Sequence, residues 1–358
     1  MYTYGDCGVM YPGQQSREKE AAMRRLWLVL MAVGVVGVWG CGQQQEAPKE
    51  TGGKPAAKMT IAVIPKGTTH EFWKTVHAGA VKASRELNVE IIWKGPMKED
   101  DREAQISVVE DFTTRKVSGI VLAPLDDTAL QTPVATAVSK GIPVVIFDSD
   151  LKGKDFTSFV ATDNFAGGKA AGEHLAKLLN GKGRVVMLRY QEGSASTMNR
   201  EKGFLSAMEK CPGIKVVSEN QHAGPTTETA YKASENLLAP LKTEKGLSID
   251  GIFCPNESST FGMLCALQDA GLAGKVSFVG FDSSTKLVDA LKNAQINGLV
   301  VQNPMRMGYL GVKTMTEHLK GQAVEKRVDT GVVLVTKENM DTPEIRELLQ
   351  PDLGKWLN

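Results

Sequence analysis

The stretch MTIAVIPKGTTHEFWKTVHAGAVKASREL, residues 59–87, decides the fold class of this chain. Its first six residues form a mostly apolar, partly β-branched run, which predicts a buried strand. A short loop containing Gly67 and two threonines follows, and from Glu71 the apolar residues recur at helical spacing. A strand that leads directly into a helix is half of the repeating unit of a parallel α/β sheet.

The same alternation continues almost to the C-terminus. Apolar runs such as GIVLA, IPVVIF, GRVVML, DGIFC, KVSFVGF and INGLVVQ are separated by segments of helical period. Nearly continuous apolar strands of this kind predict parallel sheets that are covered on both faces. About ten such strands are too many for one compact doubly wound sheet. We therefore expect an α/β protein with two doubly wound parallel-sheet lobes joined by a hinge of several chain crossings.

The lobe boundaries follow from where polar loops interrupt the alternation. The N-terminal lobe is predicted to comprise residues 59–161 plus 303–331, and the C-terminal lobe residues 162–302 plus 332–358. The hinge is then expected at three crossings, near Ala161–Asn164, Val301–Asn303 and Thr330–Val332.

The N-terminal region has the parts of an export signal. Two arginines after Met23 precede an apolar run from Leu26 to Trp39, which is too short to cross a bilayer comfortably, and Cys41 follows. A buried core helix is the alternative, but the polar segment 42–58 would leave such a helix isolated. The sequence from Val38 to Cys41, VWGC, resembles the lipobox of bacterial lipoproteins, in which the cysteine is lipidated. By this resemblance we interpret residues 1–41 as an N-terminal extension and lipoprotein signal peptide, with Met1 or Met23 as the start, and residues 42–58 as a flexible tether.

Composition excludes some classes of function. The formal net charge is +1, from 42 basic and 41 acidic residues, so no global field favours nucleic acid. Cysteine spacing fits no metal motif, and neither a metal nor a cofactor is expected. Cys254 and Cys265 are interpreted as small buried hydrophobic residues, with a disulfide between them as the alternative.

Polar residues follow several of the predicted strands. Asp148 and Asp282 each stand in a Phe-Asp-Ser sequence at a strand end, one in each lobe, while Asn256 and Gln302 follow two other strands. Ligands of open parallel sheets bind beyond the carboxyl ends of the strands. A carboxylate accepts two hydrogen bonds, which suits the vicinal hydroxyls of a sugar. Taken alone, each aspartate is more often a helix cap or a turn residue than a ligand contact. Their recurrence at corresponding strand ends favours two carboxylates that face one cleft.

Catalytic motifs are lacking. His77 lies seven residues after His70, so HEFWKTVH is not the zinc motif HExxH, and no GxSxG occurs. A sugar-modifying α/β enzyme, which would need His70 or an aspartate pair as acid and base, is the enzymatic alternative. We expect a binding protein and not an enzyme.

The segments in order resemble the type I periplasmic sugar-binding proteins of the ribose-binding family, the solute receptors of ABC importers. The resemblance is carried by IAVIPKGTTHEFWKTVHAGA, IPVVIFDSD, VATDNFAGGKAAGEHLA, GSASTMNREKGF, DGIFCPNESSTFGMLCALQDAG, VGFDSS and VVQNPMRMGYLG. It covers the chain from about Met59 to about residue 340.

The resemblance implies a set of ligand contacts. Phe72 and Trp73 fall on the aromatic residues that stack on or edge the sugar ring. Asp148 falls on the first-lobe aspartate, and the remaining polar contacts of the second lobe and hinge fall on Asn256, Asp282 and Gln302.

Other positions depart from the family pattern. Lys66 stands where ribose binders carry a serine, His70 where they carry an asparagine, and Ser149 replaces an arginine. The family's arginine in the GSAS segment aligns with Met198, and Arg200 lies one helical step further on, either as a ligand residue or as a surface charge. These departures put ribose itself in doubt and leave open an acidic or phosphorylated sugar.

By this resemblance the protein is the substrate-binding component of a sugar ABC importer in the periplasm. It is expected to be a monomer anchored to a membrane through a lipid on Cys41. Sugar would close the two lobes, and the closed form would dock on an inner-membrane permease. A sensory sugar or autoinducer receptor of the same fold is the alternative.

Overall fold

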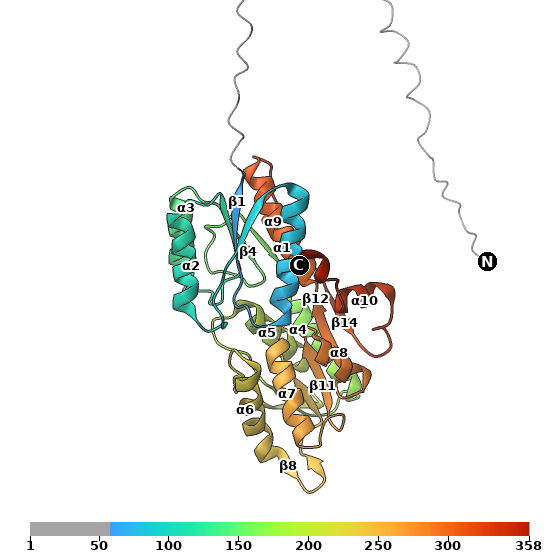
Figure 1. Ribbon diagram of the computed structural model, residues 1–358. Helices are drawn as coiled ribbons and strands as arrows, with labels where there is room; N and C mark the ends of the chain where they lie inside the picture. The colour runs from blue at the N-terminus through green and yellow to red at the C-terminus, as the bar shows by residue number, and fades with distance from the viewer. Residues whose placement is uncertain (1–57, 358) are drawn as a thin grey trace, which may run out of the picture. The chain divides into compact units, whose positions relative to one another are not determined.

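The computed structural model describes residues 58–357, which fold into two six-stranded sheets and a small two-stranded one (Figure 1). The apolar run Leu26–Trp39 and Cys41, interpreted above as export signal and lipidation site, lie outside the described residues. Among residues 58–357, no helix has the length and apolar character needed to cross a membrane.

The N-terminal lobe is built on a parallel sheet with strand order β13-β5-β4-β3-β1-β2. Helices α1 and α9 cover one face, while α2 and α3 cover the other. Neighbouring residues of one strand point to opposite faces, so Ile61 and Val63 pack under α1 and α9, and Ala62 packs under α2 and α3. The elements are β1 (Thr60–Ile64), α1 (Glu71–Leu87), β2 (Glu90–Trp93), α2 (Arg102–Thr114), β3 (Gly119–Leu122), α3 (Gln131–Ser139), β4 (Val144–Phe147), β5 (Ser158–Ala161), α9 (Pro304–Leu319) and β13 (Arg327–Asp329).

The C-terminal lobe repeats the same topology, with strand order β14-β12-β11-β10-β6-β7 and only β14 antiparallel to its neighbour. Helices α4 and α5 cover one face, and α6, α7 and α8 cover the other. The elements are α4 (Asn164–Leu178), β6 (Gly183–Met187), α5 (Ala195–Met208), β7 (Ile214–Ser218), α6 (Thr227–Leu238), the 3₁₀ helix η1 (Ala239–Leu241), β8 (Lys242–Thr243), β9 (Gly246–Leu247), β10 (Gly251–Phe253), α7 (Glu257–Asp269), β11 (Ser277–Phe281), α8 (Thr285–Lys292), β12 (Gly298–Gln302), β14 (Val332–Val335) and α10 (Pro343–Leu349). The prediction of two doubly wound α/β sheets is confirmed.

The chain passes between the two sheets at three places. It leaves β5 for α4 through Thr162, leaves β12 for α9 through Asn303, and leaves β13 for β14 through Thr330. The first and third crossings are joined, because the hydroxyl oxygens of Thr162 and Thr330 lie 3.2 Å apart. Both threonines are buried, so these crossings form a compact hinge.

The C-terminal segment departs from the predicted boundary. Residues 332–358 were assigned wholly to the C-terminal lobe, and α10 does pack on that lobe's core. However, α11 (Gly354–Leu357) contacts α1 of the N-terminal lobe, where Arg85 donates to the carbonyl oxygens of Lys355 at 3.1 Å and Trp356 at 3.0 Å. The guanidinium of Arg85 satisfies two carbonyl groups of this last helix and so holds it against the N-terminal lobe.

The cysteines of the described region are free. Cys254 is buried and Cys265 half-buried, and no disulfide joins them. Burial in the apolar core raises the pKa of the Cys254 thiol well above its usual range. The interpretation of Cys254 as a small buried hydrophobic residue therefore agrees with the structure.

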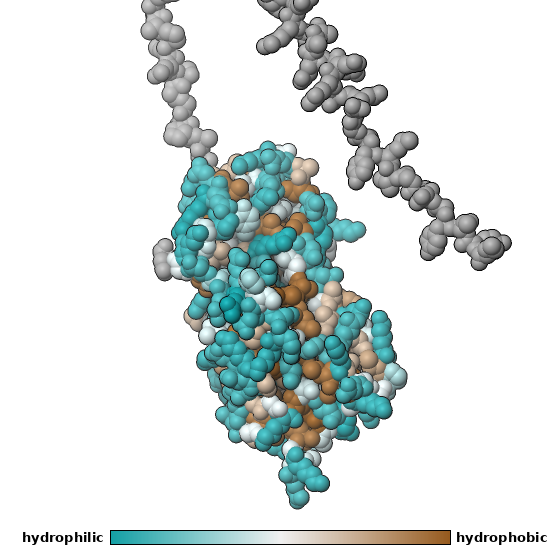
Figure 2. All heavy atoms as spheres, turned by 90° about the vertical axis from the view of Figure 1, so that its right-hand side faces the viewer, coloured by the Kyte–Doolittle hydropathy of each residue, from teal (hydrophilic) through white to brown (hydrophobic). Residues whose placement is uncertain are grey.

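The face of the molecule in Figure 2 is mainly hydrophilic, with apolar atoms in patches. Large exposed apolar side chains within residues 58–357 come from separate places: the loop after β2, α3, the two ends of α4, and α11. Apolar side chains scattered in this way need no special explanation. They are Met97, Val138, Phe165, Leu178 and Leu357.

Candidate ligand-binding site

The two Phe-Asp-Ser sequences occupy equivalent strand ends in the two lobes. Asp148 follows β4 and Asp282 follows β11, and both are buried. Both have left-handed backbone angles, with φ of +60° at Asp148 and +67° at Asp282. A non-glycine residue held in this region is uncommon and, when buried, often marks a functional site. The repeated sequence thus reflects a repeated backbone conformation that turns each carboxylate toward the space between the sheets.

Lys66 lies in the loop after β1 and pairs with Asp148. Its ammonium nitrogen is 3.0 Å from Asp148 Oδ2, with both side chains almost fully buried. The same nitrogen donates across to the other lobe, to the hydroxyls of Ser194 at 3.3 Å and Ser196 at 2.9 Å. The backbone N–H of Ser196 donates in turn to Ser149 Oγ at 3.1 Å. Lys66 therefore serves as an ion-pair partner and an interlobe contact at once.

His70 is paired with a carboxylate that sequence reasoning missed. Its Nδ1 lies 2.9 Å from Glu99 Oε1, and both side chains are buried. Burial alone would lower the pKa of His70, but the charge and hydrogen bond of Glu99, with smaller contributions from Glu257 and Asp282, raise it to about 9. Burial would likewise raise the pKa of Glu99, but His70, Lys66 and Trp73 lower it to about 2. The pair is charged at neutral pH.

The aromatic residues of α1 face different surroundings. Trp73 is only 2% exposed, donates from Nε1 to Glu99 Oε1 at 2.7 Å, and meets Phe147 edge to face at 6.1 Å between ring centroids. Phe72 packs edge to face on Trp73 at 5.0 Å between centroids and lines a cavity between the lobes. Phe72 therefore lines the cavity, whereas Trp73 packs behind Phe72 in the core of the lobe.

Asp282 is the centre of a second polar cluster. Its Oδ1 accepts from Gln302 Nε2 at 2.7 Å, and its Oδ2 accepts from the backbone N–H of Glu257 at 3.1 Å and lies 3.6 Å from Arg200 Nη1. Burial raises the pKa of Asp282, and Arg200 and Gln302 oppose that rise. Gln302 Oε1 is left without a partner.

Arg200 is a buried residue of α5 and not a surface charge. Its Nε donates to Asn164 Oδ1 at 2.8 Å and its Nη1 to the carbonyl oxygen of Pro255 at 2.9 Å. Its guanidinium stacks over Phe281, 4.0 Å from the ring centroid. The interpretation of Arg200 as an exposed helix charge is wrong, because α4 and α5 pack too closely to leave it in solvent.

Asn256 and Glu257 begin helix α7 in the C-terminal lobe. Asn256 is the N-cap, and its amide is engaged with Ser258 at 3.1 Å and with the backbone of Ser259 at 3.2 Å. The Glu257 carboxylate accepts from the first backbone N–H groups of α1, at Glu71 (3.2 Å) and Phe72 (3.0 Å). Burial raises the pKa of Glu257 to about 7, although the residue keeps partial solvent exposure.

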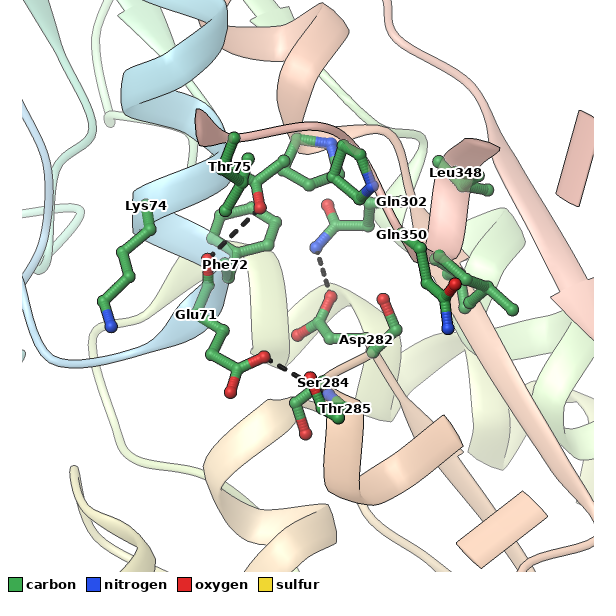
Figure 3. Close-up of a pocket in the computed structure, with 16 residues that line it drawn as sticks. Glu71, Phe72, Lys74, Thr75, Asp282, Ser284, Thr285, Gln302, Leu348 and Gln350 are labelled. Atoms are coloured by element: carbon green, nitrogen blue, oxygen red, sulfur yellow. Dashed lines mark hydrogen bonds between the residues drawn. The ribbon is translucent and has the colours of Figure 1, made fainter. Parts of the chain in front are cut away.

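A cavity of about 410 Å³ lies between the lobes beside this second cluster (Figure 3). Figure 3 shows Phe72, Asp282 and Gln302 on its wall. It also shows the Glu71 carboxylate, which accepts a hydrogen bond from the backbone N–H of Thr285 at 3.3 Å. The cavity is further lined by the C-terminal segment, through Leu348, Leu349, Gln350, Pro351 and Leu353.

The structure brings most of the sequence-predicted residues to the interlobe space, where one of them, Met198, lies apart from the others. Met198 is half-exposed and lines a different cavity, of about 680 Å³, together with Arg102, Asp126 and Glu192. That cavity also lies between the lobes, since the backbone N–H of Asp127 donates to the carbonyl of Gly193 at 2.9 Å beside it.

Sequence reasoning missed Glu99, Tyr190 and Glu257. Tyr190 crosses from the C-terminal lobe, and its hydroxyl donates to Glu99 Oε2 at 3.0 Å. Glu99 and Tyr190 lie in the loops that follow β2 and β6, so the rule of inspecting the carboxyl ends of strands could have found them. The sequence does not mark Glu257 as a site residue, because an acidic residue is common in the first turn of a helix.

The geometry can be set beside known proteins. The periplasmic binding protein domain family matches residues 61–323 of the chain. The chain belongs to this family. This periplasmic binding protein resembles the crystal structure of a carbohydrate transporter solute binding protein from Agrobacterium radiobacter in complex with D-arabinose, at 37% identity and TM-score 0.78, covering 82% of this chain and 100% of that one. An ABC transporter solute binding protein from Agrobacterium vitis with bound D-fucose is 35% identical, with TM-score 0.76 and coverage of 81% and 100%.

The chain is also similar in sequence to named sugar-binding proteins. This periplasmic binding protein is 30% identical to the D-allose-binding periplasmic protein of Escherichia coli, over 75% of this chain and 87% of that one. It is 29% identical to the ribose import binding protein of Haemophilus influenzae, over 79% and 93%. The resemblance to type I periplasmic sugar-binding proteins inferred from the motifs is confirmed.

Proposed function

We propose that this chain is the receptor subunit of an ABC importer that binds a monosaccharide between its two lobes and delivers it to an inner-membrane permease. The observation that carries the proposal is the pair of buried aspartates, Asp148 and Asp282, held in the same left-handed conformation at equivalent strand ends of the two lobes. Sugar-binding relatives and neighbours of high coverage support it. We expect ligand contacts from the side chains that the sequence indicates, except Met198, which lines the other cavity: Lys66, His70, Phe72, Trp73, Asp148, Ser149, Arg200, Asn256, Asp282 and Gln302.

We further propose that the sugar is uncharged. The buried cations of the site already have partners: Lys66 pairs with Asp148, His70 with Glu99, and Arg200 lies by Asp282. An anionic sugar would bring one more negative charge beside three buried carboxylates, where each buried cation is already paired. Lys74 lines the cavity without an ion pair to any described residue, but it is exposed, and solvent screens its charge. A neutral polyol needs only donors and acceptors, which His70 Nε2 and Gln302 Oε1 still offer.

The test is a titration of intrinsic tryptophan fluorescence, checked by calorimetry, with two matched panels. The neutral panel contains D-arabinose, D-fucose, D-allose and D-ribose, and the anionic panel contains D-glucuronate and D-ribose 5-phosphate. We expect saturable binding within the neutral panel and none within the anionic one. Tight binding of an anionic sugar alone would contradict the uncharged-ligand proposal, and a flat response to both panels would contradict sugar binding. Proton NMR of the same mixtures checks our expectation that the sugar is not converted.

We propose that the protein is exported and anchored through a lipid on Cys41, as a monomer. The basis is the apolar run and the cysteine that follows it. Mass spectrometry of the N-terminal peptide from membrane fractions tests this, with Cys41→Ser as the control. Recovery of an unmodified Cys41 in the membrane fraction would contradict the anchor.

A further inference from the structure

Glu99 receives hydrogen bonds from both lobes. It lies in the loop between β2 and α2 and is 5% exposed. Within the N-terminal lobe, its Oε1 accepts from His70 Nδ1 at 2.9 Å and Trp73 Nε1 at 2.7 Å. From the C-terminal lobe, its Oε2 accepts from the Tyr190 hydroxyl at 3.0 Å, and its backbone carbonyl accepts from Gln191 Nε2 at 2.8 Å. No other carboxylate among residues 58–357 is bound in this way by both aromatic and imidazole donors.

The hydrogen bonds that Tyr190 and Gln191 donate to Glu99 join the two lobes, so they exist only when the lobes are closed. Tyr190 follows β6 and is fully buried, with its phenol against Glu99. Separation of the lobes would return Glu99 Oε2 and the Tyr190 hydroxyl to water. The hydrogen bond from Tyr190 therefore forms on closure, and its acceptor is the same carboxylate that holds His70 and Trp73.

The contact of Glu99 with His70, inside the N-terminal lobe, sets the protonation state of His70. Because Nδ1 is bound to Glu99, the nitrogen left for a ligand is Nε2, which is buried and has no partner. The charged groups that face His70 are Glu99, Glu257 from α7 and Asp282 from the end of β11, all acidic. The imidazole is thereby kept protonated, and Nε2 is available as a charged hydrogen-bond donor.

We propose that Glu99 is a positioning residue for sugar recognition, which holds His70 as a charged donor to the ligand and links that donor to lobe closure through Tyr190. This inference rests on the proposed function, since it concerns the same site. It assigns Glu99 no contact with the sugar. The ligand group at His70 must be an acceptor, such as a hydroxyl or ring oxygen.

The first test needs no ligand. In the full-length protein, the His70 ring is titrated by NMR in the wild type and in Glu99→Gln, which keeps the shape and the acceptor for Trp73 but removes the charge. We expect a wild-type pKa near the value of about 9 that the burial and charges produce. In Glu99→Gln we expect it to fall to the ordinary range near ~6.5 or below.

Glu201→Gln is the matched control for the loss of a buried carboxylate. Glu201 lies within the C-terminal lobe, where it pairs with Arg189 at 2.7 Å and accepts from the backbone N–H of Tyr190 at 3.1 Å. We expect this variant to leave the His70 titration unchanged. An equal shift in both variants would overturn the proposal, because the effect would then come from general loosening around Tyr190.

The second test uses D-arabinose, D-fucose, D-allose and D-ribose as probes. Glu99→Gln should weaken affinity for the bound sugar by about tenfold or more at pH 8, and acidification to pH 5.5 should restore part of it by protonating His70. Tyr190→Phe should weaken affinity by about tenfold with the His70 titration unchanged, since only the interlobe hydrogen bond is lost. Glu99→Gln and His70→Gln should be non-additive when combined.

The outcomes separate the two proposals. If the wild type binds no probe, sugar binding by this site is contradicted, while the ligand-free titration still decides whether Glu99 controls His70. If the wild type binds a probe and Glu99→Gln retains wild-type affinity and pH profile, the positioning role is overturned. Should Glu99→Gln fail to fold, Tyr190→Phe decides: wild-type affinity in that variant overturns the link to closure.

Discussion

At the scale of single residues, the site is made of charges that neutralise one another. Lys66 and Asp148 form the most deeply buried ion pair of the site, and the lysine also reaches two serines of the other lobe. Burial of a charge is costly unless the charge is paired and hydrogen-bonded. Each member of such a pair therefore depends on the other.

Lys66→Met should destabilise the protein, because it leaves Asp148 buried without its cation. We expect a loss of about 3–5 kcal/mol in the free energy of unfolding, measured by urea denaturation. Lys232→Met is the control, since it breaks a fully exposed pair with Glu228 at 2.8 Å and should change the free energy of unfolding far less. Equal costs for the two variants would contradict the structural role of the buried pair.

Trp73 is expected to matter for stability as well as for ligand affinity. Trp73→Ala removes a side chain that is 2% exposed, with its hydrogen bond to Glu99, and should lower the free energy of unfolding by about 3–5 kcal/mol. Trp356→Ala, which affects a half-buried ring on the outer surface of α1, should cost clearly less. Urea denaturation of both checks this, and the reverse order would place Trp73 outside the core.

At the scale of elements, lobe closure depends on how closely loops approach. Gly193 lies in the loop between β6 and α5 and has φ of +87°. Because it has no side chain, its backbone can approach Asp126 and Asp127 of the other lobe. A Cβ at this position would collide with the Asp126 carboxylate. The glycine therefore permits the closest approach of the two lobes on this side.

Gly193→Ala should shift the protein toward the open form and weaken sugar affinity. Gly141→Ala is the matched control, because Gly141 has φ of +80° and no atom within 4 Å of an added Cβ. Both variants carry the ~1 kcal/mol backbone cost of a positive φ, but only Gly193→Ala adds an interlobe collision. Small-angle scattering with saturating D-arabinose or another bound sugar should show an enlarged radius of gyration for Gly193→Ala alone. Identical radii in the two variants would contradict this mechanism.

At the scale of the whole molecule, closure links the two lobes through groups that titrate. The His70–Glu99 pair lies within the N-terminal lobe and persists in the open form, but closure brings Glu257 and Asp282 of the C-terminal lobe toward His70, and their charges raise its pKa further, to about 9. Relative to the unfolded chain, the stability that charged His70 contributes is complete below pH 6.5 and is lost as the pH rises through about 9. The stability that Glu99 contributes is likewise present above pH 4.5 and is lost as the pH falls toward 2.

Sugar affinity should therefore be greatest near ~pH 5–6 and fall toward pH 9. Glu257 acts in the same direction, because closure raises its pKa from 4.5 to about 7, so its support for closure fades as the pH rises through that range. Since Glu257 keeps partial solvent exposure, most of the pH dependence is expected from His70. Calorimetry from pH 5 to pH 9 checks this, with His70→Gln as the variant that should lose the alkaline limb. Affinity that rises with pH would contradict the closure scheme.

The same loops show how much the sequence could predict. The strand-end rule identified Asp148, Asp282 and Gln302, because the apolar runs of parallel strands locate the carboxyl edges of the sheets. It did not identify which partner each side chain takes. Lys66 and His70 were noted as departures from a family pattern, but their counterions, Asp148 and Glu99, come from loops that are distant in the sequence.

The sequence by itself determined the two-lobe α/β fold, the family, and the strand ends where a ligand should lie, because these depend on hydrophobic period and local turn chemistry. Only the tertiary structure decided the electrostatics of the opening stretch, IPKGTTHEFWK. Its lysine and histidine carry charges that Asp148 and Glu99 neutralise, and its tryptophan is bound into the core. Charge pairing and burial depend on contacts between residues far apart in the chain, and such contacts leave no periodic trace in the sequence.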